Sequence, residues 1–227
     1  MSVINGYILT RGEGMFEFGM VQIAGISNTE EAKMLESLGV VYLGFPLFLD
    51  YHREDCPPEE VKKTIAALAP STIPVLITYL DQPQEIIDLC SFLDVSVVQL
   101  HAEMQYQELK SLKKNAPQIE IIKSLIIGKE DRCLYQKVKQ LEPFVDVFLT
   151  DTFDPETGAS GATGKTHNWS LSGELAASLN KPLILAGGLN PSNIQDAIAE
   201  VKPHGVDSHT GVENESGMKD PDKVSLF

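Results

Sequence analysis

Short runs of β-branched and other apolar residues alternate with longer segments of helical period eight times from about residue 20 onward. The candidate strands are residues 21–26, 40–45, 74–79, 95–100, 120–125, 145–150, 182–186 and 205–208. Such alternation is typical of a parallel sheet, because each parallel strand needs a crossover to reach the next one. Eight strand-helix units of roughly 26 residues each are compact but sufficient for a (β/α)8 barrel. The sequence therefore predicts an α/β chain with this architecture.

Helix boundaries between the strands are marked by capping residues. Asn28 is a candidate N-cap with Glu31 three residues later, and Gly39 marks the end of that helix. The run Pro57-Pro58-Glu59-Glu60 opens a second helix, and Asn190-Pro191 opens a third. These signals support the strand-helix alternation.

A doubly wound open sheet is the alternative for any such alternation. No G-x-G-x-x-G follows the first candidate strand, which argues against a dinucleotide-binding version. No low-complexity linker divides the chain. We therefore expect one barrel domain over residues 20–227, preceded by an N-terminal extension over residues 1–19.

The charge balance limits the partners. With 18 Lys and Arg against 32 Asp and Glu, the net charge is -14, which repels nucleic acid and anionic membranes. An anionic ligand would therefore need a local group of amides, helix N-termini or arginine. The three cysteines form no C-x-x-C pair, and no signal peptide or membrane-spanning segment is visible. We expect a cytoplasmic protein with reduced thiols.

Two glycine-containing turns are suited to phosphate. Gly187-Gly188 follows a candidate strand and leads into a helix, so backbone amides and a helix N-terminus lie close together. Thr210-Gly211 follows the last candidate strand, and phosphate usually lies after strands seven and eight of such barrels. A tight strand-helix turn without a ligand is the alternative.

A third glycine-rich segment lies in the long connection from residue 152 to residue 169. Its run Gly164-Lys165-Thr166 resembles a P-loop, but the first glycine that this motif requires falls on Ala159. We expect instead a long loop that closes over a ligand.

Two charged residues follow candidate strands at the same end of the barrel. Asp151 can act as a general acid where burial raises the pKa of its carboxyl group, or it can cap the following turn. Arg53 can hold a carboxylate in a bidentate contact, or it can pair with its acidic neighbours on the surface. His101, at a strand end, is expected to be a hydrogen-bonded structural residue. The five histidines show no metal-ligand spacing, so we expect no metal and no cofactor.

Five ordered segments carry a family resemblance. Residues 21–28 read V-Q-I-A-G-I-S-N, residues 98–101 V-Q-L-H, residues 164–169 G-K-T-H-N-W, and residues 183–191 L-I-L-A-G-G-L-N-P. Residues 205–213 read G-V-D-S-H-T-G-V-E. These resemble the motifs V-K-I-C-G-I-T-N, V-Q-L-H-G, G-T-G-K-T-F-D-W, L-A-G-G-L and G-V-D-V-S-S-G-V-E of the phosphoribosylanthranilate isomerase family of tryptophan biosynthesis.

The resemblance implies an Amadori rearrangement of N-(5′-phosphoribosyl)anthranilate to an aminoketose. It implies that Asp151 is the general acid and that Arg53 binds the anthranilate carboxylate. Asp207 would orient the amino group of the substrate. The phosphate would bind at Gly187, Gly188, Thr210 and Gly211.

One position departs from the family pattern in a way that matters for catalysis. The family's general base is the cysteine of the first-strand motif, and this chain has Ala24 there. His209 also departs from the family's serine; we expect it to bind the substrate, and it is a candidate substitute base. Loss of a base typically costs about 10²- to 10⁴-fold in rate.

Three functions remain open from the sequence. The chain is an isomerase of this family, acting weakly or with a substitute base. Alternatively, it is a relative that acts on another phosphorylated sugar or aminosugar, or a non-catalytic barrel that binds a phosphosugar or a protein partner. We expect a small phosphorylated sugar as ligand and a monomer or homodimer.

Overall fold

Eight parallel strands close into a barrel in this computed structural model, which describes residues 3–4, 7–8, 15–49, 56–128, 134–153 and 164–227. The order around the barrel is β10-β3-β4-β5-β6-β7-β8-β9. The strands are β3 Met20–Ala24, β4 Tyr42–Pro46, β5 Ile73–Thr78, β6 Val97–Leu100, β7 Glu120–Ile127, β8 Val147–Thr152, β9 Leu183–Leu185 and β10 Gly205–Ser208. Each strand of the closed barrel pairs with two neighbours, so the open-sheet alternative is excluded.

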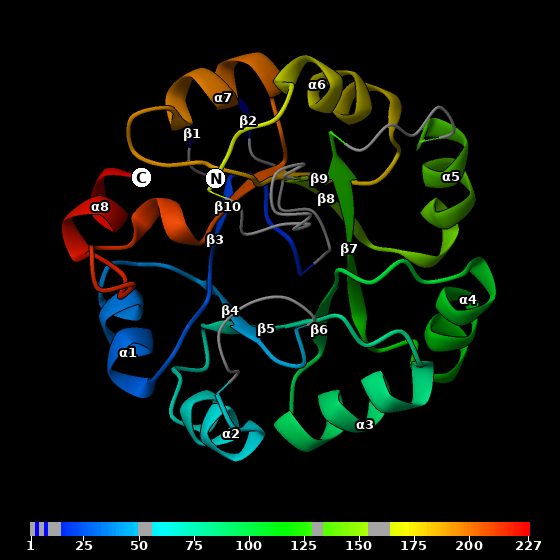
Figure 1. Cartoon of the computed structure of the whole chain (residues 1–227), viewed down its shortest axis with the longest axis horizontal. Helices are drawn as coiled ribbons and strands as arrows, with labels where there is room; N and C mark the ends of the chain where they lie inside the picture. The colour runs from blue at the N-terminus through cyan, green and yellow to red at the C-terminus, as the bar shows by residue number, and fades with distance from the viewer. Residues whose placement is uncertain (1–2, 5–6, 9–14, 50–55, 129–133, 154–163) are drawn as a thin grey trace.

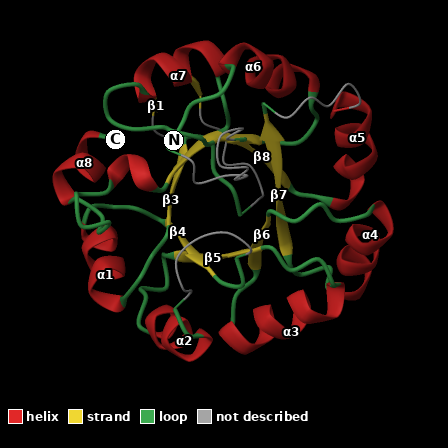
Figure 2. Cartoon of the chain, in the orientation of Figure 1, coloured by secondary structure: helices red, strands yellow, loops and turns green. Residues whose placement is uncertain are grey.

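Helices form an outer ring around the strands (Figures 1 and 2). They are α1 Thr29–Ser37, α2 Pro58–Ala66, α3 Pro83–Leu93, α4 Tyr106–Asn115, α5 Leu134–Leu141, α6 Trp169–Ser178, α7 Ile194–Val201 and α8 Pro221–Leu226. Two 3-10 turns, η1 Glu142–Phe144 and η2 Thr210–Val212, precede β8 and follow β10. The predicted (β/α)8 barrel is therefore confirmed.

Most of the predicted helix starts are confirmed. The side chain of Asn28 accepts a hydrogen bond from the amide of Glu31 at 2.9 Å, as an N-cap does. Prolines occupy the first turn of α2. The predicted start at Pro191 is wrong, because Asn190 Oδ1 accepts from the amide of Ser192 and closes a separate turn. Helix α7 begins three residues later, at Ile194.

Alternation along the strands separates two apolar layers. On β7, Ile121 and Leu125 face the helices, whereas Ile122 points into the barrel. The larger layer lies between the strands and the helix ring. The smaller one fills the barrel and includes Met20, Ala24, Tyr42, Val75, Ile77, Val97, Ile122, Val147, Leu149, Ile184 and Ala186. The barrel is thus a packed core whose floor supports the residues at the carboxyl ends of the strands.

The residues just before β3 close the amino end of the barrel. Phe16 stacks on Tyr42 with ring centroids 6.2 Å apart, and the Tyr42 hydroxyl donates to the carbonyl of Met15 at 2.7 Å. The amide of Gly19 donates to the carbonyl of His204 at 2.8 Å. Farther upstream, β1 Val3–Ile4 and β2 Tyr7–Ile8 pair antiparallel in a separate sheet.

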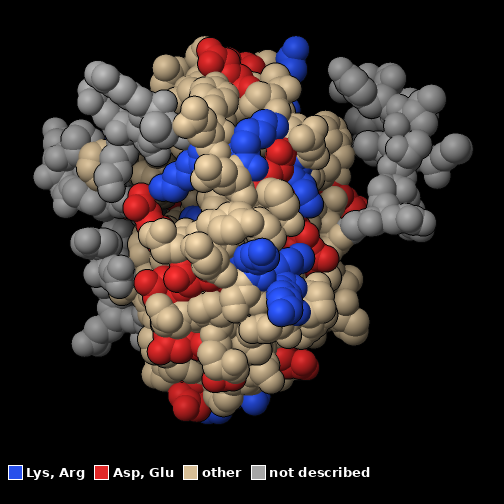
Figure 3. Space-filling view, turned by 90° about the vertical axis from the view of Figure 1, so that its right-hand side faces the viewer, with Lys and Arg blue, Asp and Glu red and all other residues tan. Residues whose placement is uncertain are grey.

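Charged side chains of both signs lie next to one another on the side of the molecule shown in Figure 3. Acidic residues occupy the first turns of α1 to α4, where they oppose the positive end of the helix dipole. The first turn of α6, by contrast, has none. In the described part of the chain, no helix is both long and apolar enough to cross a membrane.

Candidate active site

A pocket opens at the carboxyl ends of the strands, which is where (β/α)8 barrels place their functional groups. Eight of the predicted site residues line it: Ala24, Asp151, Gly187, Gly188, Asp207, His209, Thr210 and Gly211. They come from β3, β8, β9 and β10 or from the loops that follow these strands. Arg53, the ninth, lies outside the described residues. The fold thus brings together side chains that are up to 187 positions apart in the sequence.

Two buried carboxyl groups lie in this pocket. Asp151, near the end of β8, is 6 % exposed, and its Oδ1 accepts the amide of Thr152 at 2.7 Å. Asp207, on β10, accepts a hydrogen bond from Gln22 Nε2 at 2.9 Å. Burial, and next the charge of Asp151, raise the pKa of Asp207 to about 7. A buried carboxyl group of raised pKa beside a second carboxyl group is suited to proton transfer.

A row of polar side chains that the sequence analysis missed supports Asp207 from inside the barrel. Gln22 Nε2 also donates to Gln99 Oε1 at 2.6 Å, and Gln99 Nε2 lies 2.8 Å from His101 Nε2. The His101 ring stacks on Tyr79 with centroids 5.2 Å apart. Burial lowers the pKa of His101 to about 3, so this imidazole is neutral. A glutamine at an inward position of an otherwise apolar strand, as in V-Q-I and V-Q-L-H, was the available signal.

His101 is therefore hydrogen-bonded, as expected, and it also lines the pocket. Its Nδ1 is buried and has no hydrogen-bond partner within the described part of the chain. A buried donor or acceptor of this kind is costly unless a ligand or water satisfies it.

The turn after β9 lines the pocket and is held by two asparagine side chains. Asn190 and Asn193 both donate side-chain hydrogen bonds to the carbonyl of Gly188, at 3.2 and 3.0 Å. In a trans peptide the following N–H points the opposite way, so the amide of Leu189 is turned from these asparagines. Leu189 lines the pocket and was missed by the sequence analysis. The turn requires glycine, since Gly187 and Gly188 have φ of +91° and +65°.

The turn after β10 packs directly on the turn after β9. Ser208 Oγ donates to the carbonyl of Leu189 at 2.9 Å, and a side chain at Gly211 would overlap that same carbonyl. Within the ranges that the structure describes, no residue accepts a hydrogen bond from the amides of Gly187, Gly188, Thr210 or Gly211. Two adjacent turns with available amides form a potential anion site.

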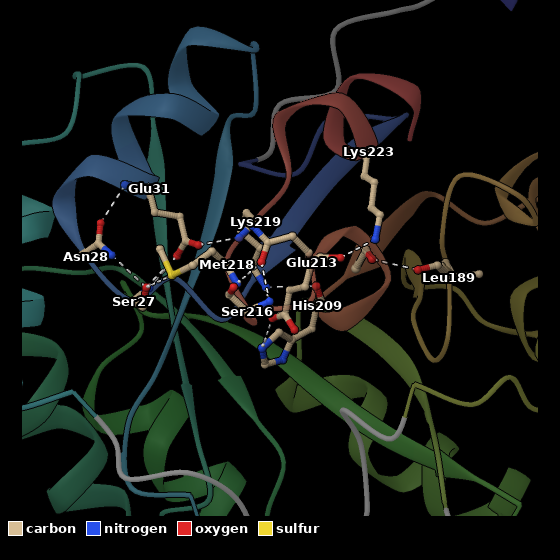
Figure 4. A network of polar contacts seen from close by, with 12 residues as sticks. Ser27, Asn28, Glu31, Leu189, His209, Glu213, Ser216, Met218, Lys219 and Lys223 are labelled. Carbon is tan, nitrogen blue, oxygen red and sulfur yellow. Dashed lines mark hydrogen bonds and ion pairs between the residues drawn. The ribbon is translucent and has the colours of Figure 1, made fainter.

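The first strand presents no reactive group to the pocket. Ala24 is 5 % exposed and packs against Gly44, where an added Cβ would lie 3.2 Å from the Cβ of Ala24. Beside it, the ring of His209 lies over Gly25, and its Nε2 is 3.3 Å from Glu213 Oε1. Figure 4 shows His209, Glu213 and the buried Lys219 joined in one network.

The cysteines that the structure describes lie away from Ala24 and the pocket. Cys90 is buried in α3, and burial raises the pKa of its thiol to about 12. Cys56 is partly buried just before α2, and Cys133 lies outside the described residues. Among the residues that the structure describes, no three His, Cys, Asp or Glu side chains are grouped to hold a metal.

Fold and pocket together define a (β/α)8-barrel protein with a carboxylate-lined pocket at the carboxyl ends of its strands. The family model for N-(5′-phosphoribosyl)anthranilate (PRA) isomerase matches residues 21–227. The chain therefore belongs to the phosphoribosylanthranilate isomerase family.

Relatives and solved structures agree with this assignment. The chain is 35 % identical over 209 residues to N-(5′-phosphoribosyl)anthranilate isomerase 2 of Methanosarcina mazei, with 91 % of each chain covered. It superposes on phosphoribosyl anthranilate isomerase of Thermotoga maritima with a TM-score of 0.78 and 30 % identity, covering 92 % of this chain and 96 % of that one. A further isomerase structure, in complex with reduced 1-(o-carboxyphenylamino)-1-deoxyribulose 5-phosphate, gives a TM-score of 0.75 and 28 % identity, with the same coverage of the two chains.

Proposed function

We propose that this chain isomerises N-(5′-phosphoribosyl)anthranilate to 1-(o-carboxyphenylamino)-1-deoxyribulose 5-phosphate. The observation that carries the proposal is the shared pocket of Asp151, Asp207 and the two glycine turns, in a chain that belongs to this isomerase family. The reaction needs a proton donor at the ring oxygen and a proton acceptor at C2′. It also needs a site for phosphate on a protein whose net charge is -14.

Asp151 is the proposed general acid. Its carboxyl group lies at the end of β8 in the pocket, and it donates a proton to the furanose ring oxygen while the C1′–O bond breaks. The lone pair of the anthranilate nitrogen forms the C1′=N bond of the ring-opened iminium. Asp207 accepts the N–H of the substrate and keeps this nitrogen in the plane that the developing double bond requires.

In the proposed function, the substrate phosphate binds at the turns of Gly187-Gly188 and Thr210-Gly211. Their amides donate to the phosphate oxygens without adding a mobile side chain, which limits the entropy lost on binding. Arg53, which lies outside the described residues, is proposed to bind the anthranilate carboxylate.

The proposed setting is the cytoplasm, where Cys56 and Cys90 remain thiols. We further propose that the protein works as a monomer or homodimer with a small phosphorylated substrate and no nucleic-acid or membrane partner. Light scattering of the purified protein distinguishes the two assemblies.

The test is turnover of freshly generated N-(5′-phosphoribosyl)anthranilate by the purified protein, followed by loss of substrate fluorescence. We expect a rate above the uncatalysed one, and the Ala24→Cys variant serves as a parallel sample. No turnover by either protein would rule out the isomerase. Turnover of a different phosphorylated aminosugar would then favour the second candidate function, a family relative that acts on another substrate. The alanine at position 24, where the family has cysteine, is the observation that favours this candidate.

A further inference from the structure

Removal of the C2′ proton needs a base near the end of β3, where Ala24 has none. The pairing of β10 with β3 brings the residues that follow the two strands close together. Asp207 is paired with Gln22 and Ser208 with Ile23, and the ring of the next residue, His209, lies against Gly25, which follows Ala24. An imidazole at this point enters the pocket from the strand next to the vacant position.

The local backbone makes room for the ring. Gly25 follows Ala24 with a φ of +82°, a conformation that side chains rarely adopt. A Cβ at Gly25 would overlap His209 Nε2 and would lie 2.8 Å from Cε1. His209 therefore occupies space that only a glycine at position 25 leaves open.

A buried ion pair fixes the orientation of this ring. Glu213 Oε1 lies 3.3 Å from His209 Nε2 and accepts from Lys219 Nζ at 2.7 Å. The same Nζ donates to the carbonyl of His209 at 3.0 Å, and the Lys219 side chain is fully buried. The ion pair engages the ring through Nε2, so Nδ1 is the ring nitrogen left to accept a proton. A carboxylate on one ring nitrogen selects the tautomer whose other nitrogen can accept a proton.

Lys219 is itself held from α1. Its amide donates to Glu31 Oε1 at 2.8 Å, and Glu31 Oε2 accepts the amide of Ser27 at 2.9 Å. Figure 4 shows this chain of contacts from Asn28 through Glu31 and Lys219 to Glu213 and His209. The network therefore ties the ring to the loop that follows Ala24.

We propose that His209 is the catalytic base that takes over from the missing first-strand group, and that Glu213 is the positioning residue that holds its ring. This inference rests on the proposed isomerase function. Nδ1 takes the C2′ proton, the C2′–H electron pair forms the C1′=C2′ bond, and the C1′=N pair returns to nitrogen to give the neutral enolamine. The enolamine becomes the ketose as a proton moves from the C2′ hydroxyl to C1′. His209 loses its proton to solvent and Asp151 regains one, so no net proton is consumed.

Several charged and titratable groups of the described residues lie around His209. Glu213 and Lys219 lie in the segment after β10, His101 faces the ring from the end of β6, and Asp151 and Asp207 line the same pocket. Burial raises the pKa of Glu213, but the hydrogen bonds from His209 and Lys219 outweigh this and lower it to about 2. Glu213 is thus ionised throughout the working pH range, and its charge stabilises the imidazolium that forms.

The experiment measures kcat and KM for the wild type, His209→Gln and Glu213→Gln. We expect His209→Gln to lower kcat by about 10²- to 10⁴-fold with little change in KM. Glu213→Gln should keep measurable activity and lower kcat less than His209→Gln does, again with little change in KM, because the imidazole remains but its ring is held less firmly.

A rescue and a control complete the design. Ala24→Cys in the His209→Gln background should restore at least about tenfold of the lost kcat, since a thiolate then replaces the imidazole. His204→Gln is the matched control, because His204 contacts the carbonyl of Phe16 at the opposite end of the barrel. We expect its kcat to equal that of the wild type.

Each outcome separates the two proposals. An active wild type with unchanged kcat in His209→Gln overturns the role of His209 and leaves the isomerase function standing. An inactive wild type with an active Ala24→Cys variant also overturns the role of His209 as the base, but it supports the pocket as an isomerase site. If neither protein turns over the substrate, both proposals fail.

Discussion

The β8–β9 side of the pocket and the β3–β10 side hold their functional groups by different means. On the β8–β9 side, the Gly187-Gly188 turn follows a family motif, and hydrogen bonds between side chains and the backbone hold this turn and Asp151. On the β3–β10 side, Ala24 departs from the family pattern, and the proposed replacement is held mainly by the side chains of Glu213 and Lys219. Groups fixed by backbone geometry are hard to move without rebuilding the fold. A proton acceptor, by contrast, can be supplied from a neighbouring strand.

Asp207 lies between the two sides. It comes from β10, it is hydrogen-bonded to Gln22 of β3, and the charge of Asp151 of β8 contributes to its raised pKa. A substitution on either side of the pocket should therefore change the pKa of Asp207. The comparison between the two sides can thus be tested by substitutions on each of them.

Asp151→Asn should have the largest effect. The amide keeps the size of the side chain and an acceptor for the amide of Thr152, but it has no proton to give to the ring oxygen. We expect kcat to fall by about 10²- to 10⁴-fold. Steady-state kinetics checks this, and calorimetry with reduced 1-(o-carboxyphenylamino)-1-deoxyribulose 5-phosphate should show an affinity within about threefold of the wild type.

A loss of binding equal to the loss of rate would contradict the assignment, because Asp151 would then hold the ligand. The same variant should lower the pKa of Asp207, since a neighbouring negative charge is removed.

The architecture was predictable from the sequence because strand and helix periods alternate over nearly the whole chain. β10 was predicted at residues 205–208, the bounds that the structure has, since the turn of Thr210-Gly211 follows it closely. β7, by contrast, runs two residues beyond the predicted end at residue 125, because Ile126 and Ile127 pair with Asp151 and Thr152 of β8. Such pairing depends on a distant strand, which local patterns do not show.

The candidate site was predictable where a motif lies within one segment. Asp151 and the two glycine turns each follow a strand directly, so topology alone places them at one end. The contacts of Gln22 with Gln99 and Asp207 span up to 185 positions, and only the closed barrel brings them together. The position of His209 beside Ala24 likewise depends on the register of the first and last barrel strands.

Asp207→Asn should change how stability depends on pH. The folded pKa of about 7 exceeds the ordinary value of 3.8, so between these values the unfolded chain releases a proton that the folded chain keeps. Wild-type stability should therefore fall as pH rises through this window. Asparagine keeps the acceptor for Gln22 and removes the titration. Relative to the wild type, the variant should gain about 2 kcal/mol between pH 5.5 and pH 8.

Urea unfolding at the two pH values measures this difference. Asp196→Asn, on α7 and outside the pocket, is the control and should follow the wild type at both values. If the free energy of unfolding changed equally with pH for Asp207→Asn and the wild type, Asp207 would be ionised in the folded state. Asp207 would then not couple the two sides of the pocket through a raised pKa.

Gly188→Ala should have a smaller effect on catalysis than Asp151→Asn, and it tests the side of the pocket that matches the family. Gly188 has a φ of +65°, and a Cβ there would lie 2.5 Å from the carbonyl carbon of Lys165 and 2.7 Å from the nitrogen of Thr166. Both are backbone atoms, so the turn must shift, and left-handed strain adds about 1 to 2 kcal/mol. We expect KM to rise by about 10- to 100-fold with a smaller change in kcat, because the phosphate lies away from the reacting carbons.

Gly173→Ala is the matched control, because the nearest atoms to its added Cβ are 3.5 and 3.7 Å away and it lies in α6, outside the pocket. It should leave KM unchanged and raise stability by about 0.5 to 1 kcal/mol, as alanine does in a helix interior. Equal KM values for Gly188→Ala and Gly173→Ala would mean that the turn after β9 does not bind the phosphate. The β8–β9 side would then contribute only Asp151, and the anion site would have to lie on the turn after β10.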